Sequence, residues 1–299
     1  MIDATGERYV PKKMRGLIEN EHLHRYSAAR RLCEGQIVLD IASGEGYGSY
    51  LLSQVAKQVI GVDIDFRSVQ HGRSIYSNRR ENVQYLNASA DHLPFRSKSF
   101  DTIISFETIE HIRDHNAVIK ECARVLKCDG VFLISTPNRK CYSEAPAYNN
   151  LYHIKEFDRE EFKHLLKNYF SCVDIYQQSI ICPSMIKPEK MLGGDAVAIE
   201  AGEGADIIPF EFAEFQPTYY LALCSNAPQL TPILTQSLFL NKNWIDLHSM
   251  TIELENLRKL KIALDFQRPV QRINLCLDEV LYDFGFKGHV DERLLFRLS

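Results

Sequence analysis

The chain of 299 residues lacks the short motifs that mark several protein classes. Its eight cysteines include no Cys-x-x-Cys pair, which excludes a zinc ribbon and a thioredoxin-like redox motif. No run of residues approaches the roughly 18 consecutive apolar residues of a membrane-spanning helix. The first residues also lack the apolar stretch of a secretory signal, so we expect a cytoplasmic protein with reduced thiols and no membrane span.

The chain also lacks an excess of positive charge. Its formal net charge is −4 at pH 7, so the molecule as a whole does not attract polyanions, and we expect no general nucleic-acid binding. Hydrophobic residues make up 45% of the sequence and charged residues 25%, which are the proportions of an ordinary globular protein. The chain can therefore form a core of normal size.

Between residues 36 and 170, short β-branched runs alternate with segments of helical spacing. Strands are expected at 36–42, 57–65, 83–90, 100–107, 130–138, 171–178 and 218–225, and helices at 17–32, 49–56, 67–79, 116–127 and 158–169. This alternation predicts an α/β fold, a doubly wound parallel sheet with helices on both faces. Ligands of such sheets bind at the carboxyl ends of the strands, so the loops there should line the site.

Two segments stand outside this alternation. Residues 179–217 separate the last two expected strands and are rich in glycine and acid, which makes them a candidate lid or acceptor-recognition segment. Residues 227–299 are expected to form a helical C-terminal extension, because apolar side chains fall on heptad positions between Leu240 and Leu264. That pattern is compatible either with a coiled-coil seam of a homodimer or with a helix packed on the rest of the chain.

The loop after the first expected strand is built from small residues, but it is not the Gly-x-Gly-x-x-Gly loop of dinucleotide enzymes, because Ser49 stands at the third glycine. The spacing from Asp40 to Gly46 instead follows Asp-x-Gly-x-Gly-x-Gly, with Ala42 at the first glycine. An alanine is tolerable there if the backbone does not need a positive φ. Asp63 ends the second strand about 20 residues later, where an acid accepts the hydroxyls of a ribose.

In these residues, and in the stretch "LPFRSKSFDTIIS", the chain resembles the class I S-adenosylmethionine-dependent methyltransferases over roughly residues 20–226. The resemblance implies a seven-stranded, Rossmann-like methyltransferase domain at 1–226 that uses S-adenosylmethionine. It implies a cofactor site made of Tyr26, Asp40, Ala42, Ser43, Gly44, Gly46, Asp63, Ile64, Ser89, Ala90 and Phe106. Tyr26 is the candidate to close over the cofactor, or else an ordinary core residue. Ser89 and Ala90 stand where the family often has Asp and a small residue that contact adenine.

On the acceptor side, Glu107, Glu110 and His111 are spaced i, i+3, i+4, which predicts one face of a helix that begins at the strand end. Two carboxylates and an imidazole suit a divalent ion such as Mg²⁺. The pattern resembles the metal-binding segment of the ubiquinone-pathway O-methyltransferases and of the small-RNA terminal 2′-O-methyltransferases. The resemblance to the second group implies His153, in "LYHIKEF", as the fourth ligand. The alternatives are metal-free catalysis by Glu107 and His111, as acid and base or by positioning the acceptor, and a structural role.

Several short stretches, among them "EHLHRY", "STPN" and "YHIKEF", resemble bacterial methyltransferases found among enzymes of cell-surface glycan synthesis. This resemblance implies O-methylation of a sugar or glycan hydroxyl in polysaccharide biosynthesis. The rival acceptors are a quinone or other small aromatic precursor, which needs a deep apolar pocket, and an RNA 2′-hydroxyl, which needs a basic track. A non-catalytic binding or scaffold subunit that assembles through its helical extension is the alternative from another class.

Overall fold

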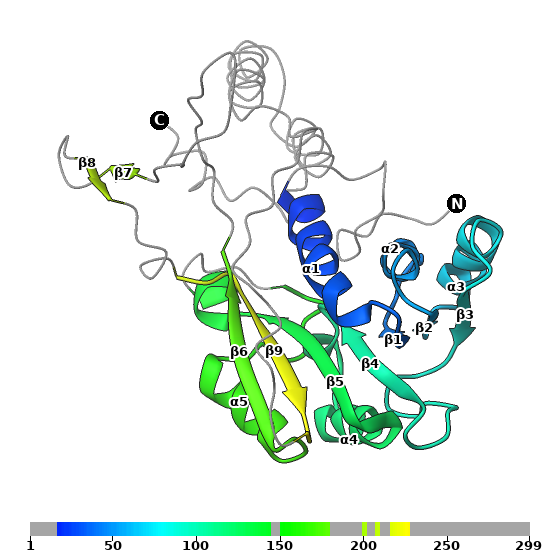
Figure 1. Ribbon diagram of the computed structural model, residues 1–299. Helices are drawn as coiled ribbons and strands as arrows, with labels where there is room; N and C mark the ends of the chain where they lie inside the picture. Colours follow the sequence, from blue (N-terminus) through cyan, green and yellow to red (C-terminus); the bar gives the residue numbers. More distant parts are fainter. Residues whose placement is uncertain (1–16, 145–149, 180–198, 202–206, 210–215, 228–299) are drawn as a thin grey trace, which may run out of the picture.

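The computed structural model describes residues 17–144, 150–179, 199–201, 207–209 and 216–227 (Figure 1). Most of the predicted C-terminal extension, with its heptad pattern, lies outside these residues. The central feature is a seven-stranded sheet of order β3-β2-β1-β4-β5-β9-β6. Its strands are β1 (Ile37–Ile41), β2 (Gln58–Asp63), β3 (Val83–Asn87), β4 (Phe100–Ser105), β5 (Leu126–Pro137), β6 (Cys172–Gln178) and β9 (Tyr219–Ser225).

The strand order reverses at β1, which pairs in parallel with β2 on one side and with β4 on the other. A crevice therefore opens at the carboxyl ends of β1 and β4, the usual ligand position of a doubly wound sheet. β9 is antiparallel to both of its neighbours, β5 and β6. The expected α/β fold is confirmed, with one antiparallel strand inserted near an edge. Within the predicted insertion, β7 (Ile199–Ala201) and β8 (Ile207–Pro209) pair with each other in a two-stranded sheet.

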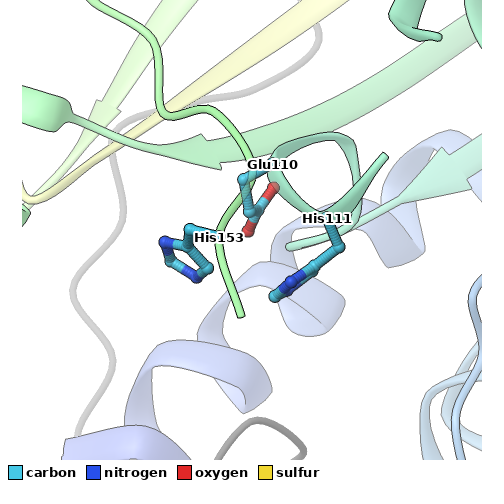
Figure 2. A group of neighbouring side chains, drawn as sticks. All are labelled: Glu110, His111 and His153. Carbon is cyan, nitrogen blue, oxygen red and sulfur yellow. The ribbon is translucent and has the colours of Figure 1, made fainter. Parts of the chain in front are cut away.

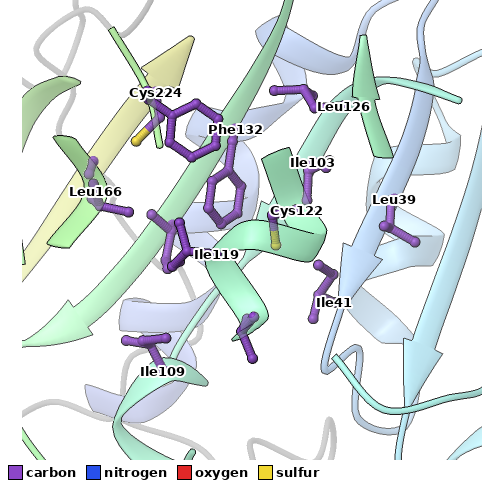
Figure 3. Close-up of a cluster of buried hydrophobic side chains, with 14 of the residues drawn as sticks. Leu39, Ile41, Ile103, Ile109, Ile119, Cys122, Leu126, Phe132, Leu166 and Cys224 are labelled. Carbon is purple, nitrogen blue, oxygen red and sulfur yellow. The ribbon is translucent and has the colours of Figure 1, made fainter. Parts of the chain in front are cut away.

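Helices cover both faces of the large sheet (Figure 1). They are α1 (Leu17–Cys33), α2 (Tyr47–Ser53), α3 (Phe66–Gly72), α4 (His115–Val125) and α5 (Arg159–Lys167). Helices α1 to α3 pack on one face and α4 and α5 on the other, because successive strand residues such as Val38 and Leu39 point to opposite faces. Figure 3 shows the second core, in which Ile119 of α4 and Leu166 of α5 lie near Phe132 of β5.

The helix boundaries follow local capping chemistry. Asp158 is the N-cap of α5, since its carboxylate accepts the backbone N–H groups of Glu160 and Glu161. Helix α2 begins two residues earlier than expected, directly after Gly46, and ends at Ser53. The helix expected at 67–79 is α3 followed by a π-helical turn, Arg73–Ser77. None of the helices in the described ranges has the length and apolar composition of a membrane span.

Candidate active site

A cleft of about 800 Å³ opens at the carboxyl edge of the sheet. Most of the residues predicted for the site line it, and they come from segments that are far apart in the sequence. They are Tyr26, Ala42, Ser43, Gly44, Asp63, Ile64, Ser89, Ala90, Phe106, Glu107 and His111. The other four predicted residues do not line the cleft. They are Asp40, Gly46, Glu110 and His153.

The loop after β1 is a tight left-handed turn. Ala42, Gly44 and Gly46 have φ angles of 55°, 56° and 100°. The backbone at Ala42 does need a positive φ, so the condition for a tolerable alanine is not met, and the alanine takes a conformation that a glycine would adopt without strain. At Gly46 a side chain is also blocked by space, because a Cβ atom would lie 2.5 Å from the ring of Tyr85.

Asp63 fastens this loop to the end of β2. Its Oδ2 accepts the N–H of Gly44 at 2.8 Å, and its Oδ1 accepts the N–H of Asp65 at 2.8 Å. A carboxylate can accept several hydrogen bonds, and Asp63 lines the cleft. The predicted contact of Asp63 with ribose hydroxyls agrees with this position and stays a prediction.

Asp40 lies beneath the loop and is fully buried. Its carboxylate accepts the hydroxyl of Ser49 at 2.6 Å and that of Tyr26 at 3.2 Å. Burial raises the pKa of Asp40 to about 7, although the two hydroxyls favour the charged form and partly offset this rise. Asp40 therefore stabilises the loop through buried hydrogen bonds. One of its partners is Ser49, which stands at the third glycine position of the dinucleotide motif.

Tyr26 is a core residue that also borders the cleft, and its closing over the cofactor stays a prediction. It is buried in α1, yet its ring borders the cleft and meets the rings of Tyr47 and Phe106 edge to face at 5.4 and 5.1 Å. The ring lies so close to Gly48 that a Cβ at that position would overlap it. Burial, followed by the charge of Asp40, raises the pKa of Tyr26 well above its usual value, so the hydroxyl keeps its proton.

At the other end of the cleft, Ile64 is 72% exposed. An apolar side chain open to the cleft suits a flat ring of a ligand better than water. Nearby, the hydroxyl of Ser89 donates to Asp91 Oδ1 at 2.5 Å. Sequence reasoning missed Asp91, which also lines the cleft and supplies a carboxylate two residues after the position where the family often has one.

Glu107 does not share a helical face with Glu110 and His111, so this expectation is wrong. The chain turns at Glu107 with a φ of 48°, and only a 3-10 turn, Ile109–His111, follows. Ser135 imposes this turn, because its Oγ accepts the N–H of Glu107 at 3.1 Å and donates to the carboxylate at 2.6 Å. The carboxylate also lies 3.8 Å from the buried guanidinium of Arg25, a partner that the sequence did not predict.

Glu110, His111 and His153 form a compact group in which one possible ligand atom from each lies within 4.8 Å of the others. Figure 2 shows the carboxylate of Glu110 between the two imidazoles. The group assembles because the backbone oxygen of Glu110 accepts the N–H groups of Ile154 and Lys155 at 2.7 and 3.1 Å. Three of the four predicted metal ligands thus come together, whereas Glu107 is not part of this group.

The donor set of this group fits a divalent cation. A carboxylate buried in the protein requires hydrogen bonds or a positive charge near it, and Glu110 is fully buried. Two imidazoles and one carboxylate suit Mn²⁺, Fe²⁺ or Zn²⁺ better than Mg²⁺, which prefers oxygen ligands. His111 also lines the cleft, so an ion held here would border the space open to a ligand.

Comparison with known proteins agrees with this geometry. Residues 39–134 match the model of a family described as a methyltransferase domain. A "Probable S-adenosylmethionine-dependent methyltransferase" of Mycolicibacterium smegmatis is 37% identical over 174 residues, which are 56% of this chain and 64% of that protein. The chain thus spans less than two thirds of this curated relative. A ubiquinone biosynthesis O-methyltransferase of Chelativorans sp. is 28% identical over 118 residues, 40% of this chain and 47% of that protein.

A crystal structure of an S-adenosylmethionine-dependent methyltransferase from Thermotoga maritima has the same fold, with a TM-score of 0.50 and 20% identity. It covers 70% of this chain, and the match includes 90% of that protein. The strand order, the loop after β1 and the family match all fall on the same part of the sheet. In the residues of this sheet the chain is therefore similar to the class I, S-adenosylmethionine-dependent methyltransferases.

Proposed function

We propose that the protein transfers a methyl group from S-adenosylmethionine to a hydroxyl oxygen. The observation that carries this proposal is the left-handed loop from Ala42 to Gly46, which Asp63 ties to the end of β2 at the edge of the cleft. The bound donor supplies a methyl group that is already activated by the positive charge on sulfur. The protein then has to align the acceptor oxygen and remove its proton.

The residues along the cleft fit the three parts of this donor. The backbone around Gly44 suits the methionine part, and the Asp63 carboxylate suits the ribose hydroxyls. The exposed Ile64 and the neighbouring Ala90 offer apolar surface to adenine. Ser89, whose hydroxyl is held by Asp91, adds polar groups at that end.

A nicotinamide dinucleotide fits this loop poorly. The third glycine of the dinucleotide motif gives close contact between helix and strand. Here that position is Ser49, and its hydroxyl is committed to the buried Asp40. The same loop therefore supports S-adenosylmethionine as the methyl donor and disfavours a nicotinamide dinucleotide.

We further propose that Glu110, His111 and His153 hold a divalent cation that assists the transfer. A cation bound to an acceptor hydroxyl lowers the pKa of that hydroxyl and fixes its position. The support is the closeness of the three side chains together with the position of His111 on the cleft. Without an ion, His111 and Glu107, which also lines the cleft, are the groups available to accept the proton.

For the acceptor we propose a sugar or glycan hydroxyl. The side chains that line the cleft around His111 include the polar Glu107, Thr108 and Tyr152 beside the apolar Phe106 and Ile112. Such a surface suits a polyhydroxylated acceptor through hydrogen bonds. The second candidate is a quinone or other aromatic precursor, which the ubiquinone biosynthesis relative favours.

A screen of methyl transfer tests this proposal. Labelled S-adenosylmethionine is offered with nucleotide sugars, glycans and catechols, with and without Mn²⁺ or Mg²⁺. We expect label on a sugar hydroxyl, dependence on the ion, and a large loss of transfer in Glu110→Ala, with the exposed Glu160→Ala as the matched control. Transfer to catechols alone would favour the aromatic acceptor. Full activity after exhaustive chelation would show that the transfer does not need a divalent cation.

A further inference from the structure

His153 is held on both sides of its ring. Its Nδ1 lies 2.6 Å from Glu156 Oε1, and its Nε2 lies 3.0 Å from the side-chain nitrogen of Asn150. The side-chain oxygen of Asn150 accepts the backbone N–H of Tyr152 at 3.0 Å, which fixes the orientation of that amide. Both ring nitrogens of His153 therefore have a defined neighbour.

These neighbours require the same tautomer of His153. An ionised carboxylate only accepts hydrogen bonds, so the proton opposite Glu156 sits on Nδ1. The Asn150 amide turns its N–H group toward Nε2, so Nε2 carries the lone pair. A neutral imidazole with its lone pair on a defined nitrogen is the form in which histidine binds a metal ion, and an ion at Nε2 would take the place of the Asn150 N–H.

The Glu156 carboxylate is itself fixed. It is buried, and its second oxygen accepts the hydroxyl of Ser143 at 2.7 Å. At the neighbouring ring, His111 Nδ1 lies 3.0 Å from the backbone oxygen of Tyr152, which can only accept. Nδ1 of His111 therefore also carries the proton, and both imidazoles have their lone pair on Nε2.

We propose that Glu156, supported by Ser143, is a positioning residue that holds His153 in the Nδ1-protonated tautomer for a divalent cation. This proposal rests on the cation site of the proposed function. Carboxylates behind a ligating histidine fix the ring and raise its basicity, and their loss typically lowers metal affinity by 10–100-fold. Glu156 contacts His153 and would act only through it.

The tautomer can be measured without any metal. Long-range ¹H–¹⁵N spectra of the full chain with ¹⁵N-labelled histidine distinguish the two tautomers, and His153→Ala assigns the signal. We expect an Nδ1-protonated His153 in the wild type and in Glu156→Gln, whose amide oxygen still accepts. Glu156→Leu should raise the share of the Nε2-protonated form, and Glu156→Leu combined with Asn150→Leu, which also removes the N–H opposite Nε2, should raise it further. An Nε2-protonated ring in the wild type would overturn the proposal, even if the leucine variant did not fold.

Mn²⁺ titration of the same proteins tests the consequence for binding. We expect the dissociation constant to rise by about 10–100-fold in Glu156→Leu, by less in Ser143→Ala, and not at all in Glu160→Leu, a control in the first turn of α5. Unchanged affinity in a folded Glu156→Leu variant would contradict the positioning role and leave the cation site intact. Absence of Mn²⁺ binding by the wild type would overturn the cation site and this proposal with it.

Discussion

Ala42 adopts a left-handed backbone conformation at the start of the loop after β1. For a residue with a Cβ this conformation costs roughly 1–2 kcal/mol, and the greater entropy of glycine in the unfolded chain offsets part of any gain on replacement. We predict that Ala42→Gly raises the free energy of unfolding by up to about 1 kcal/mol, as measured by urea denaturation.

Two glycines provide the controls for this prediction. Gly35→Ala introduces backbone strain alone, because φ is 71° and no atom lies within 4 Å of the added carbon. Gly46→Ala adds the overlap with Tyr85 and should destabilise the protein more than Gly35→Ala does. A loss of stability in Ala42→Gly would show that the strain at this position is not relieved by glycine.

The buried Asp40 predicts a pH dependence of stability. Its pKa is raised by burial from 3.8 to about 7, so between these values the folded protein keeps a proton that the unfolded chain has lost. The stabilisation from this bound proton is fully present below about pH 4 and is lost as the pH rises toward 7. Relative to Asp40→Asn, which stays neutral, the wild type should therefore lose stability over this range and then level off.

Urea denaturation of both proteins at several pH values between 5 and 8 measures this difference. Comparison with the asparagine variant removes the contributions of groups that titrate equally in both proteins. A difference that stays constant, or that increases in favour of the wild type as the pH rises, would show that Asp40 is not protonated in the folded state.

At the scale of elements, α1 packs onto α2 through Tyr26 and Gly48. Alanine is favoured over glycine inside a helix, yet we predict that Gly48→Ala destabilises the protein by about 1–3 kcal/mol because its methyl group overlaps the tyrosine ring. In the Tyr26→Ala background the same change should be neutral or stabilising. Thermal denaturation of the four proteins in this double-mutant cycle measures the coupling, and additive effects would contradict the contact.

Local patterns were sufficient to predict the strands of the sheet and the loop after β1. Buried parallel strands are short β-branched runs, and the small residues of the loop are dictated by backbone geometry within a few positions. Local patterns did not predict the grouping of His153 with Glu110, which was inferred from a family resemblance. Two backbone hydrogen bonds create this grouping, and they join segments that are more than forty residues apart in the sequence.

The structure around Glu107 could not be predicted from its neighbours. The spacing of the acids indicated a helix, but Ser135 on β5 holds Glu107 in a left-handed conformation and prevents the first helical turn. Arg25 escaped notice for a related reason, since an arginine in an amphipathic helix usually points to solvent. Here it is buried over Tyr219 and donates to Gln178, both of which lie on strands far along the chain.

At the scale of the whole molecule, the net charge of −4 predicts weak interaction with nucleic acid. We expect no saturable binding of a short RNA at micromolar protein and physiological salt in a fluorescence anisotropy titration. Tight binding that weakens steeply with added salt would reveal a basic track and would make an RNA hydroxyl the acceptor to test first.

The central claim is that the cleft binds S-adenosylmethionine, and calorimetric titration tests it most directly. We expect one site per chain, no binding of NAD, and an affinity at least tenfold lower in Asp63→Ala, because charge-assisted hydrogen bonds contribute about 1.5–3 kcal/mol. The exposed Glu81→Ala serves as the matched control and should bind like the wild type. Binding of NAD, or the absence of S-adenosylmethionine binding by the folded wild type, would contradict the account.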